Sequence, residues 1–399
     1  MLAIHAPDEG MSISVTERQD FQRCQRMWQF GSPNMLALEP KQVAPALYVG
    51  AGVHFGLAAQ PAGYDPIEMA RLWCDEQERK YAEAYKEWTG VSPSNEEWVE
   101  FQESRLLVIK LLTHYFEHYG PDPVKPYTFE AAEITFKCPI PGTNGFLVGT
   151  IDGILSRGQE LWLKENKTYS QKPNEEDLQD DDQQLGYMWA ARQLFGVTCV
   201  GILYDGLMKR VPQPPRVLKD GSVSVAVDQY TTPKLYRDTL AEQGLKPTDK
   251  PKGSTTFDTY QEFIDLLEHR MKQPVNNFFA RFRFRRSEAE IDSFGEQLPI
   301  LYDRMLYAKQ NPETIIPNFR WEGCWDCNYR DLCRLTQRKE DVEYTIEQYY
   351  RSSPGYTTRW ALEGDRLTLN GLDDLRTFYN NIKDEPYLAL LGEGKEQTT

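Results

Sequence analysis

The sequence has no long hydrophobic run and no excess of positive charge. No stretch approaches the about 20 consecutive apolar residues that a membrane-spanning helix needs. The first residues, MLAIHAPDEG, lack a basic stretch followed by an apolar one. These absences predict a cytoplasmic protein with no membrane partner. The formal net charge of −15 excludes a protein that coats nucleic acid by bulk charge, but it allows one basic groove on an acidic body.

The sequence also lacks a nucleotide-binding phosphate loop and the signs of a disulfide framework. No G-x4-G-K-[ST] motif occurs, so this sequence encodes no helicase motor. Seven cysteines are an odd number in a chain of 399 residues without a secretory leader. This favours a metal site or free thiols over disulfides.

Hydrophobic periodicity predicts a mixed α/β protein of the α+β kind. A first helix over residues 16–30 opens with a capping box at Thr16 and carries Cys24 on its buried stripe. A second helix, over residues 48–60, carries His54. Two longer helices follow, and then come three strands, a helix and a buried strand, expected at residues 128–138, 146–155, 161–168, 181–194 and 197–204. The three consecutive strands are close enough to form an antiparallel meander.

The most informative residues are two carboxylates and a lysine in adjacent strands. Gly149-Thr-Ile-Asp152 lies in the second strand and Glu165-Asn-Lys167 in the third. Neighbouring antiparallel strands bring Asp152 and Glu165 to one end of a hairpin, and Lys167 shares the face of Glu165. Two carboxylates suit Mg²⁺ or Mn²⁺, which would acidify a water, while Lys167 orients that water or stabilises the transition state.

Spacing alone leaves a second interpretation open, because carboxylates and lysines alternate on many solvated strands. The apolar setting favours the catalytic interpretation, since charges are costly to bury beside Ile151, Ile154, Leu161 and Leu163. The chemistry indicated is phosphodiester hydrolysis.

These two runs resemble motifs two and three of the RecB-type PD-(D/E)XK nucleases, with Ile151 in place of the proline in the family name. The resemblance implies a restriction-endonuclease-like core of order αβββαβ, with a helical insertion and a C-terminal region closed by an iron–sulfur cluster. It also implies a metal shell made by His54, Asp152, Glu165 and the backbone carbonyl of Asn166. A packed core histidine is the alternative for His54.

A motif in the helix after the three strands matches the same family. Gln183-Gln-Leu-Gly-Tyr187 resembles the family's Q-x3-Y motif, which lies beside the active site. Residues four apart share one helix face, so Gln183 and Tyr187 could reach the scissile phosphate or DNA together. A polar helix edge is the alternative.

Three cysteines with C-x2-C-x5-C spacing occur late in the chain, at Cys324, Cys327 and Cys333. Three thiolates leave a tetrahedral site or a cubane one ligand short, and Cys24 is the candidate for the fourth. One early and three late cysteines resemble the subgroup that includes AddB and the CRISPR-associated exonucleases. That resemblance implies a [4Fe–4S] cluster, with zinc as the alternative because spacing cannot separate the two.

Arginines alternate with aromatics at strand period in the stretch from Arg281 to Arg285. One face would present Arg281, Arg283 and Arg285, which could contact phosphates beside aromatics that stack on bases. A solvated edge strand guarded by arginines is the alternative.

The motifs together predict one nuclease domain over residues 14–340, between an N-terminal extension (1–13) and a C-terminal extension of unknown role (341–399). Within it we expect a helical subdomain, a catalytic core and a hairpin insertion, at about residues 64–120, 127–204 and 205–256. The predicted function is a metal-dependent DNA exonuclease or end-processing nuclease in recombination or repair, acting on single strands or free ends beside a helicase or recombination protein. The alternatives are a non-catalytic DNA-binding subunit and an RNA-directed nuclease.

Overall fold

The computed structural model describes residues 10–41, 45–92, 94–319, 321–325, 327–352, 373, 375–377 and 380. Most of the predicted N-terminal extension, and most of the predicted C-terminal one, lie outside these residues. Among the described residues, no helix is long and apolar enough to cross a membrane.

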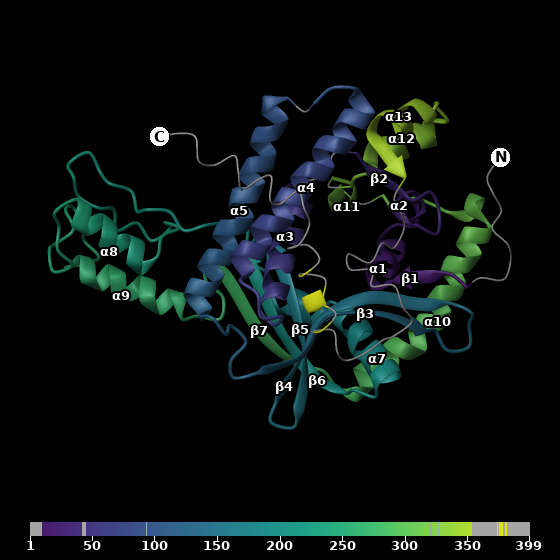
Figure 1. Ribbon diagram of the computed structural model, residues 1–399, viewed down its shortest axis with the longest axis horizontal. Helices are drawn as coiled ribbons and strands as arrows, with labels where there is room; N and C mark the ends of the chain where they lie inside the picture. The colour runs from purple at the N-terminus through teal and green to yellow at the C-terminus, as the bar shows by residue number, and fades with distance from the viewer. Residues whose placement is uncertain are drawn as a thin grey trace.

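A mixed sheet lies at the centre of the described residues, with helices on both sides (Figure 1). Its six strands are β1 (Ser12–Ser14), β3 (Thr128–Pro139), β4 (Phe146–Arg157), β5 (Glu160–Tyr169), β6 (Cys199–Met208) and β7 (Phe279–Arg285). Strands β3, β4 and β5 form the expected antiparallel meander. Strand β6 runs parallel to β5, and β7 is antiparallel to β6. The mixed α/β fold with a restriction-endonuclease-like core is therefore confirmed.

One edge of β4 is shared by two strands that do not meet. Strand β3 pairs along the other edge, β1 pairs in parallel with residues 146–148, and β5 pairs with residues 153–157. Residues 149–152 consequently have no strand partner on this edge in the described part of the chain. Asp152 lies in this gap. On this edge, no paired strand among the described residues blocks the approach of a ligand to its side chain.

Helices on opposite sides of the sheet build two separate cores. On one side α3 (Pro45–Ala59) packs against α4 (Pro66–Thr89) and α5 (Asn95–Tyr119), which form the expected helical insertion. On the other, α7 (Gln183–Phe195) packs on the meander and β6, with α10 (Glu288–Gln310) behind it. The buried stripe of α7 includes Met188 and Trp189, so the helix is fixed firmly over the strands that carry the carboxylates.

The first predicted helix is wrong in two respects. It is divided into α1 (Val15–Arg23) and α2 (Gln25–Gly31), because Cys24 has extended backbone (φ −162°, ψ 109°) and ends the first helix. The capping box is formed by Ser14 and Glu17 rather than by Thr16. Cys24 is therefore a half-buried residue in a break between helices, not part of a buried helical stripe.

The region expected to form a hairpin insertion contains more than a hairpin. Strand β6 continues to Met208, and after it a single antiparallel bridge joins Val217 to Val223 around the positive-φ Gly221. Helices α8 (Pro233–Glu242) and α9 (Tyr260–Met271) then pack around a core of their own, which includes Tyr236 and Phe263. They form a lobe that projects from the body of the molecule (Figure 1).

Shorter elements join the two ends of the described chain. A small antiparallel sheet pairs β2 (Leu38–Pro40) with β8 (Tyr350–Ser352). The remaining elements are α6 (Glu175–Asp180), a 3-10 turn (Pro312–Thr314), α11 (Trp321–Trp325), α12 (Arg330–Arg338) and α13 (Glu343–Tyr349). Residues 38–40 and 350–352, far apart in the sequence, thus meet near α2 (Figure 1).

Candidate active site

Asp152 and Glu165 lie on neighbouring strands beside the gap in β4. The register that pairs Gly153 with Lys164 places Asp152 opposite Glu165. The Asn166 N–H donates a hydrogen bond to Asp152 Oδ2 (2.7 Å), and the Lys167 ammonium is 2.8 Å from Glu165 Oε1. The structure therefore brings together the two carboxylates and the lysine that the sequence singles out.

Burial gives the two carboxylates different electrostatics. The Glu165 side chain is only 2% exposed, and burial raises its pKa although the Lys167 charge opposes this effect. Its Oε2 is buried without a hydrogen-bond partner in the described part of the chain. Burial would also raise the pKa of Asp152, but His54, the Asn166 N–H and Lys167 together lower it. An unpaired buried carboxylate oxygen is costly, and a cation would remove that cost.

His54 reaches the site from α3. Its Nδ1 is 3.6 Å from Asp152 Oδ1, so the histidine faces the carboxylates rather than an apolar core. The helix lies close to β5 at Gly50, where a Cβ would come within 3.3 Å of Thr168 Oγ1. Gly52 faces α4 and α5 instead, where a Cβ would come within 2.9 Å of the Trp73 and Val108 side chains. The small residues before His54 thus bring the imidazole to the strands.

Gln183 and Tyr187 extend the site along α7, one turn apart. The Lys167 ammonium donates to Gln183 Oε1 (2.6 Å), and Gln183 Nε2 donates to the Tyr187 hydroxyl (2.7 Å). Tyr187 is buried against Phe136 and packs over Gly149, where a Cβ would come within 3.0 Å of its ring, and its hydroxyl orients Gln183. Burial of Lys167 would lower its pKa, but Glu165 and Asp152 raise it, which keeps the amine charged.

The site thus combines two neighbouring strands that each carry one carboxylate, a lysine two positions after the second carboxylate, and a glutamine on the following helix. The strands belong to a mixed sheet. A family profile described as the PD-(D/E)XK nuclease superfamily matches residues 12–334. The chain belongs to the PD-(D/E)XK nuclease superfamily. No match was found among curated proteins. The family match includes β4, β5, α7 and all four cysteines of the predicted cluster.

In this PD-(D/E)XK chain the four cysteines of the early and late segments lie in one neighbourhood, and all four are half-buried. Burial raises the pKa of Cys327 and Cys333, and the neighbouring thiols, Cys24 among them, add to both shifts. Asn318 also joins the segments, since its N–H donates to Cys24 Sγ (3.4 Å). In the described residues, however, no group of three or more His, Cys, Asp or Glu side chains has a geometry that could hold a metal ion.

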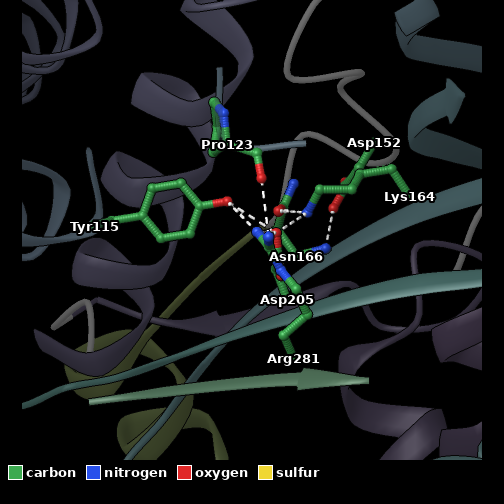
Figure 2. Close-up of polar contacts among 7 residues, drawn as sticks. All are labelled: Tyr115, Pro123, Asp152, Lys164, Asn166, Asp205 and Arg281. Carbon is green, nitrogen blue, oxygen red and sulfur yellow. Dashed lines mark hydrogen bonds and ion pairs between the residues drawn. The ribbon is translucent and has the colours of Figure 1, made fainter. Parts of the chain in front are cut away.

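Behind Asp152 lies a buried ionic network that was not expected from the sequence (Figure 2). It joins Lys164, Asp205, Arg281 and Tyr115. The prediction that Arg281 is presented to phosphates is wrong, because its guanidinium binds Asp205 through two nitrogens. Arg283 and Arg285 are exposed, and Arg285 pairs with Glu160 (2.7 Å). The available signal was an aspartate inside the buried run of β6, which requires a cationic partner.

Proposed function

We propose that this chain is a divalent-metal-dependent deoxyribonuclease that hydrolyses phosphodiester bonds as an exonuclease or end-processing enzyme. The observation that carries the proposal is the buried Glu165 Oε2 beside Asp152, which has no hydrogen-bond partner among the described residues, in a site that also holds a charged lysine. Membership of a nuclease superfamily supports DNA as the substrate. The phosphate loop that a helicase motor needs does not occur in the sequence, so a partner helicase or recombination protein would supply single strands or ends.

The residues present suit a hard cation. Asp152, Glu165 and His54 would hold Mg²⁺ or Mn²⁺ together with the Asn166 backbone carbonyl, because carboxylate and carbonyl oxygens are the preferred donors of these ions. A bound ion would supply positive charge against the reacting phosphate and acidify a water molecule.

The chain's own groups then orient the substrate. Lys167 is fixed between Glu165 and Gln183, so its ammonium is held in one position where it can stabilise negative charge on the phosphate. Gln183 is fixed in turn by Tyr187, which makes Tyr187 a positioning residue. Fixed donors need no reorganisation during the reaction, and this is the main source of their effect.

We also propose that Cys24, Cys324, Cys327 and Cys333 hold a [4Fe–4S] cluster with a structural role. The four thiols are chemically suited to iron–sulfur or zinc, and their mutual effect on the pKa values of Cys327 and Cys333 supports a common site. Such a site would join segments 300 positions apart along the chain. Iron and sulfide analysis of anaerobically purified protein separates the cluster from zinc.

The deciding experiment is degradation of end-labelled single- and double-stranded DNA by anaerobically purified protein with Mg²⁺ or Mn²⁺. Lys167→Ala should lower the cleavage rate by about 100-fold or more, because it removes a fixed charge at the phosphate. Lys234→Ala, which breaks an exposed ion pair with Asp238 (2.9 Å) in α8, is the matched control and should cleave normally. If the wild-type protein binds DNA without cleaving it, the chain is a DNA-binding subunit instead. If it prefers labelled RNA, its substrate is RNA.

A further inference from the structure

The buried network of Lys164, Asp205, Arg281 and Tyr115 ends at the candidate active site (Figure 2). Side chains alternate along β5, so Lys164 and Asn166 lie on the face opposite to Glu165 and Lys167. The Lys164 ammonium is 2.8 Å from Asp205 Oδ2 and also donates to the Asn166 side-chain oxygen. The lysine therefore joins the next strand, β6, to the peptide that contacts Asp152.

Besides Lys164 of β5, residues of two other elements hold Asp205. Arg281 of β7 contacts both of its carboxylate oxygens, and the Tyr115 hydroxyl of α5 donates to Oδ2 (2.8 Å). Arg281 additionally donates to the Pro123 carbonyl (2.9 Å). Asp205 is consequently a fixed anchor for Lys164, and its own position does not depend on the lysine alone.

The same network has a path to the carboxylate. Lys164 holds the side chain of Asn166, and the backbone N–H of Asn166 donates to Asp152 Oδ2. We propose that Lys164 is a positioning residue, which fixes the Asn166 peptide so that Asp152 and the Asn166 carbonyl are preorganised for a divalent cation. This inference rests on the proposed function, because it concerns the same metal site.

A contribution to stability alone does not explain why a lysine is buried at position 164. The Lys164 side chain is 3% exposed, and the Asp205 side chain with which it forms an ion pair is 2% exposed. Ion pairs at such depth are often replaceable by apolar residues at no cost in stability, since desolvation offsets much of the Coulomb attraction. Asp205 already has Arg281 and Tyr115 as partners, so among the described residues the distinct contribution of Lys164 is its hydrogen bond to Asn166.

The test variant is Lys164→Met, which keeps most of the side-chain length without the ammonium. It should fold, because Asp205 keeps the Arg281 charge and the Tyr115 hydroxyl. We expect its affinity for Mn²⁺, measured by calorimetry on the full chain, to fall by about 10- to 100-fold, with a similar fall in kcat and little change in KM for DNA. Groups that orient metal ligands typically have effects of this size.

A second readout requires no metal. The Asn166 amide is held by Asp152, so hydrogen exchange of peptides that contain residues 164–167 should accelerate in metal-free Lys164→Met. The matched control is Tyr302→Phe, which removes a buried hydroxyl that bonds the Met11 N–H (3.0 Å) and Asn144 (3.1 Å). It should lower stability but leave Mn²⁺ affinity and exchange in β5 unchanged.

A double-mutant cycle shows whether Lys164 acts through Asn166. Asn166→Ala removes the side-chain acceptor and keeps the backbone N–H and carbonyl. The double variant should lose no more Mn²⁺ affinity than Lys164→Met alone, because both changes break one path.

Unchanged Mn²⁺ affinity and unchanged β5 exchange in folded Lys164→Met would overturn the proposal. So would losses that Tyr302→Phe shares, since these would follow from stability alone. If wild type neither cleaves DNA nor binds Mn²⁺, the proposed function fails. Exchange in β5 would then decide by itself whether Lys164 fixes the Asn166 peptide.

Discussion

At the scale of single residues, His114 of α5 shows how burial alone fixes a protonation state. Its ring lies between Phe278 and Phe279, with centroids 4.9 Å from each, and its Nε2 has no hydrogen-bond partner in the described part of the chain. Burial lowers the pKa from 6.5 to about 4, and His118 adds to this effect. The Glu117 carboxylate, 4.0 Å from Nδ1, does not offset it because that side chain is 70% exposed and well solvated.

A neutral buried histidine makes stability depend on pH. The unfolded chain binds a proton near pH 6.5, whereas folded His114 resists protonation to about pH 4. Its contribution is therefore present above pH 6.5 and is lost as the pH falls toward 4. His114→Phe should keep the aromatic packing. As the pH is lowered toward 4, its free energy of unfolding should fall by up to about 3 kcal/mol less than that of the wild type.

Urea unfolding across that pH range checks this expectation. The exposed His269 provides the control, and His269→Gln should follow the wild-type pH dependence. Parallel pH curves for wild type and His114→Phe would show that another group is responsible for the loss.

At the scale of elements, α1 is fixed to the start of α7. Buried Arg18 forms an ion pair with Asp182, and Gln19 donates to Asp181 (3.0 Å) and Asp182 (2.9 Å). Asp182 is the N-cap residue of α7 and directly precedes Gln183. The helix that ends at Cys24 therefore holds the first turn of the helix that contacts Lys167.

Removal of one partner should reveal this contact. Asp182→Ala leaves the Arg18 charge buried without its carboxylate, and we expect about 2 kcal/mol lower stability, less than for a fully buried pair because Asp182 is 33% exposed. Arg18→Met with Asp182→Ala should be less destabilised than the sum of the single changes. Additive free energies from urea unfolding would mean that the two side chains do not interact.

Elements with local patterns could be predicted from the sequence, and elements defined by distant partners could not. The meander follows from alternation, and its short connections make Asp152 and Glu165 meet. Strand β1 has only three residues, too few for a period, and it exists because β4 offers an open edge. The contact of Asp205 with Arg281 depends on the β6–β7 register across 76 positions.

The capping-box error has a related cause. Both Ser14 and Thr16 begin a pattern that ends three residues later in Glu or Gln. The capping box forms with Glu17 because the folded chain buries this residue, which accepts hydrogen bonds from Trp28 Nε1 (2.9 Å) and Asn34 (3.0 Å). No local rule includes those two donors, which arrive from α2 and the loop after it.

At the scale of the whole molecule, the cysteine neighbourhood joins the two ends of the family match. Arg23 and Asn318 connect the segments directly, through Asn318 to the Arg23 carbonyl (2.9 Å) and Arg23 to the Gly323 carbonyl (3.3 Å). The small sheet of β2 and β8 lies next to this junction. These two hydrogen bonds are exposed, so a covalent or metal link at the cysteines would add to the stability of this junction.

Loss of the early cysteine tests that conclusion. Cys24→Ser removes the one proposed ligand from the N-terminal segment, so it should lower iron content and destabilise the protein by up to about 5 kcal/mol, the scale of a crosslink closing a loop of this length. Cys74→Ala, a change to a buried thiol in the core around α3, should keep full iron content. Thermal unfolding and iron analysis of both variants give the comparison. A stable Cys24→Ser protein with wild-type iron would mean that the late cysteines bind metal without joining the chain ends, and that the ion pair of Arg18, the hydrogen bond of Asn318 and the packing of Phe30 against Leu332 suffice to hold the N-terminal helices.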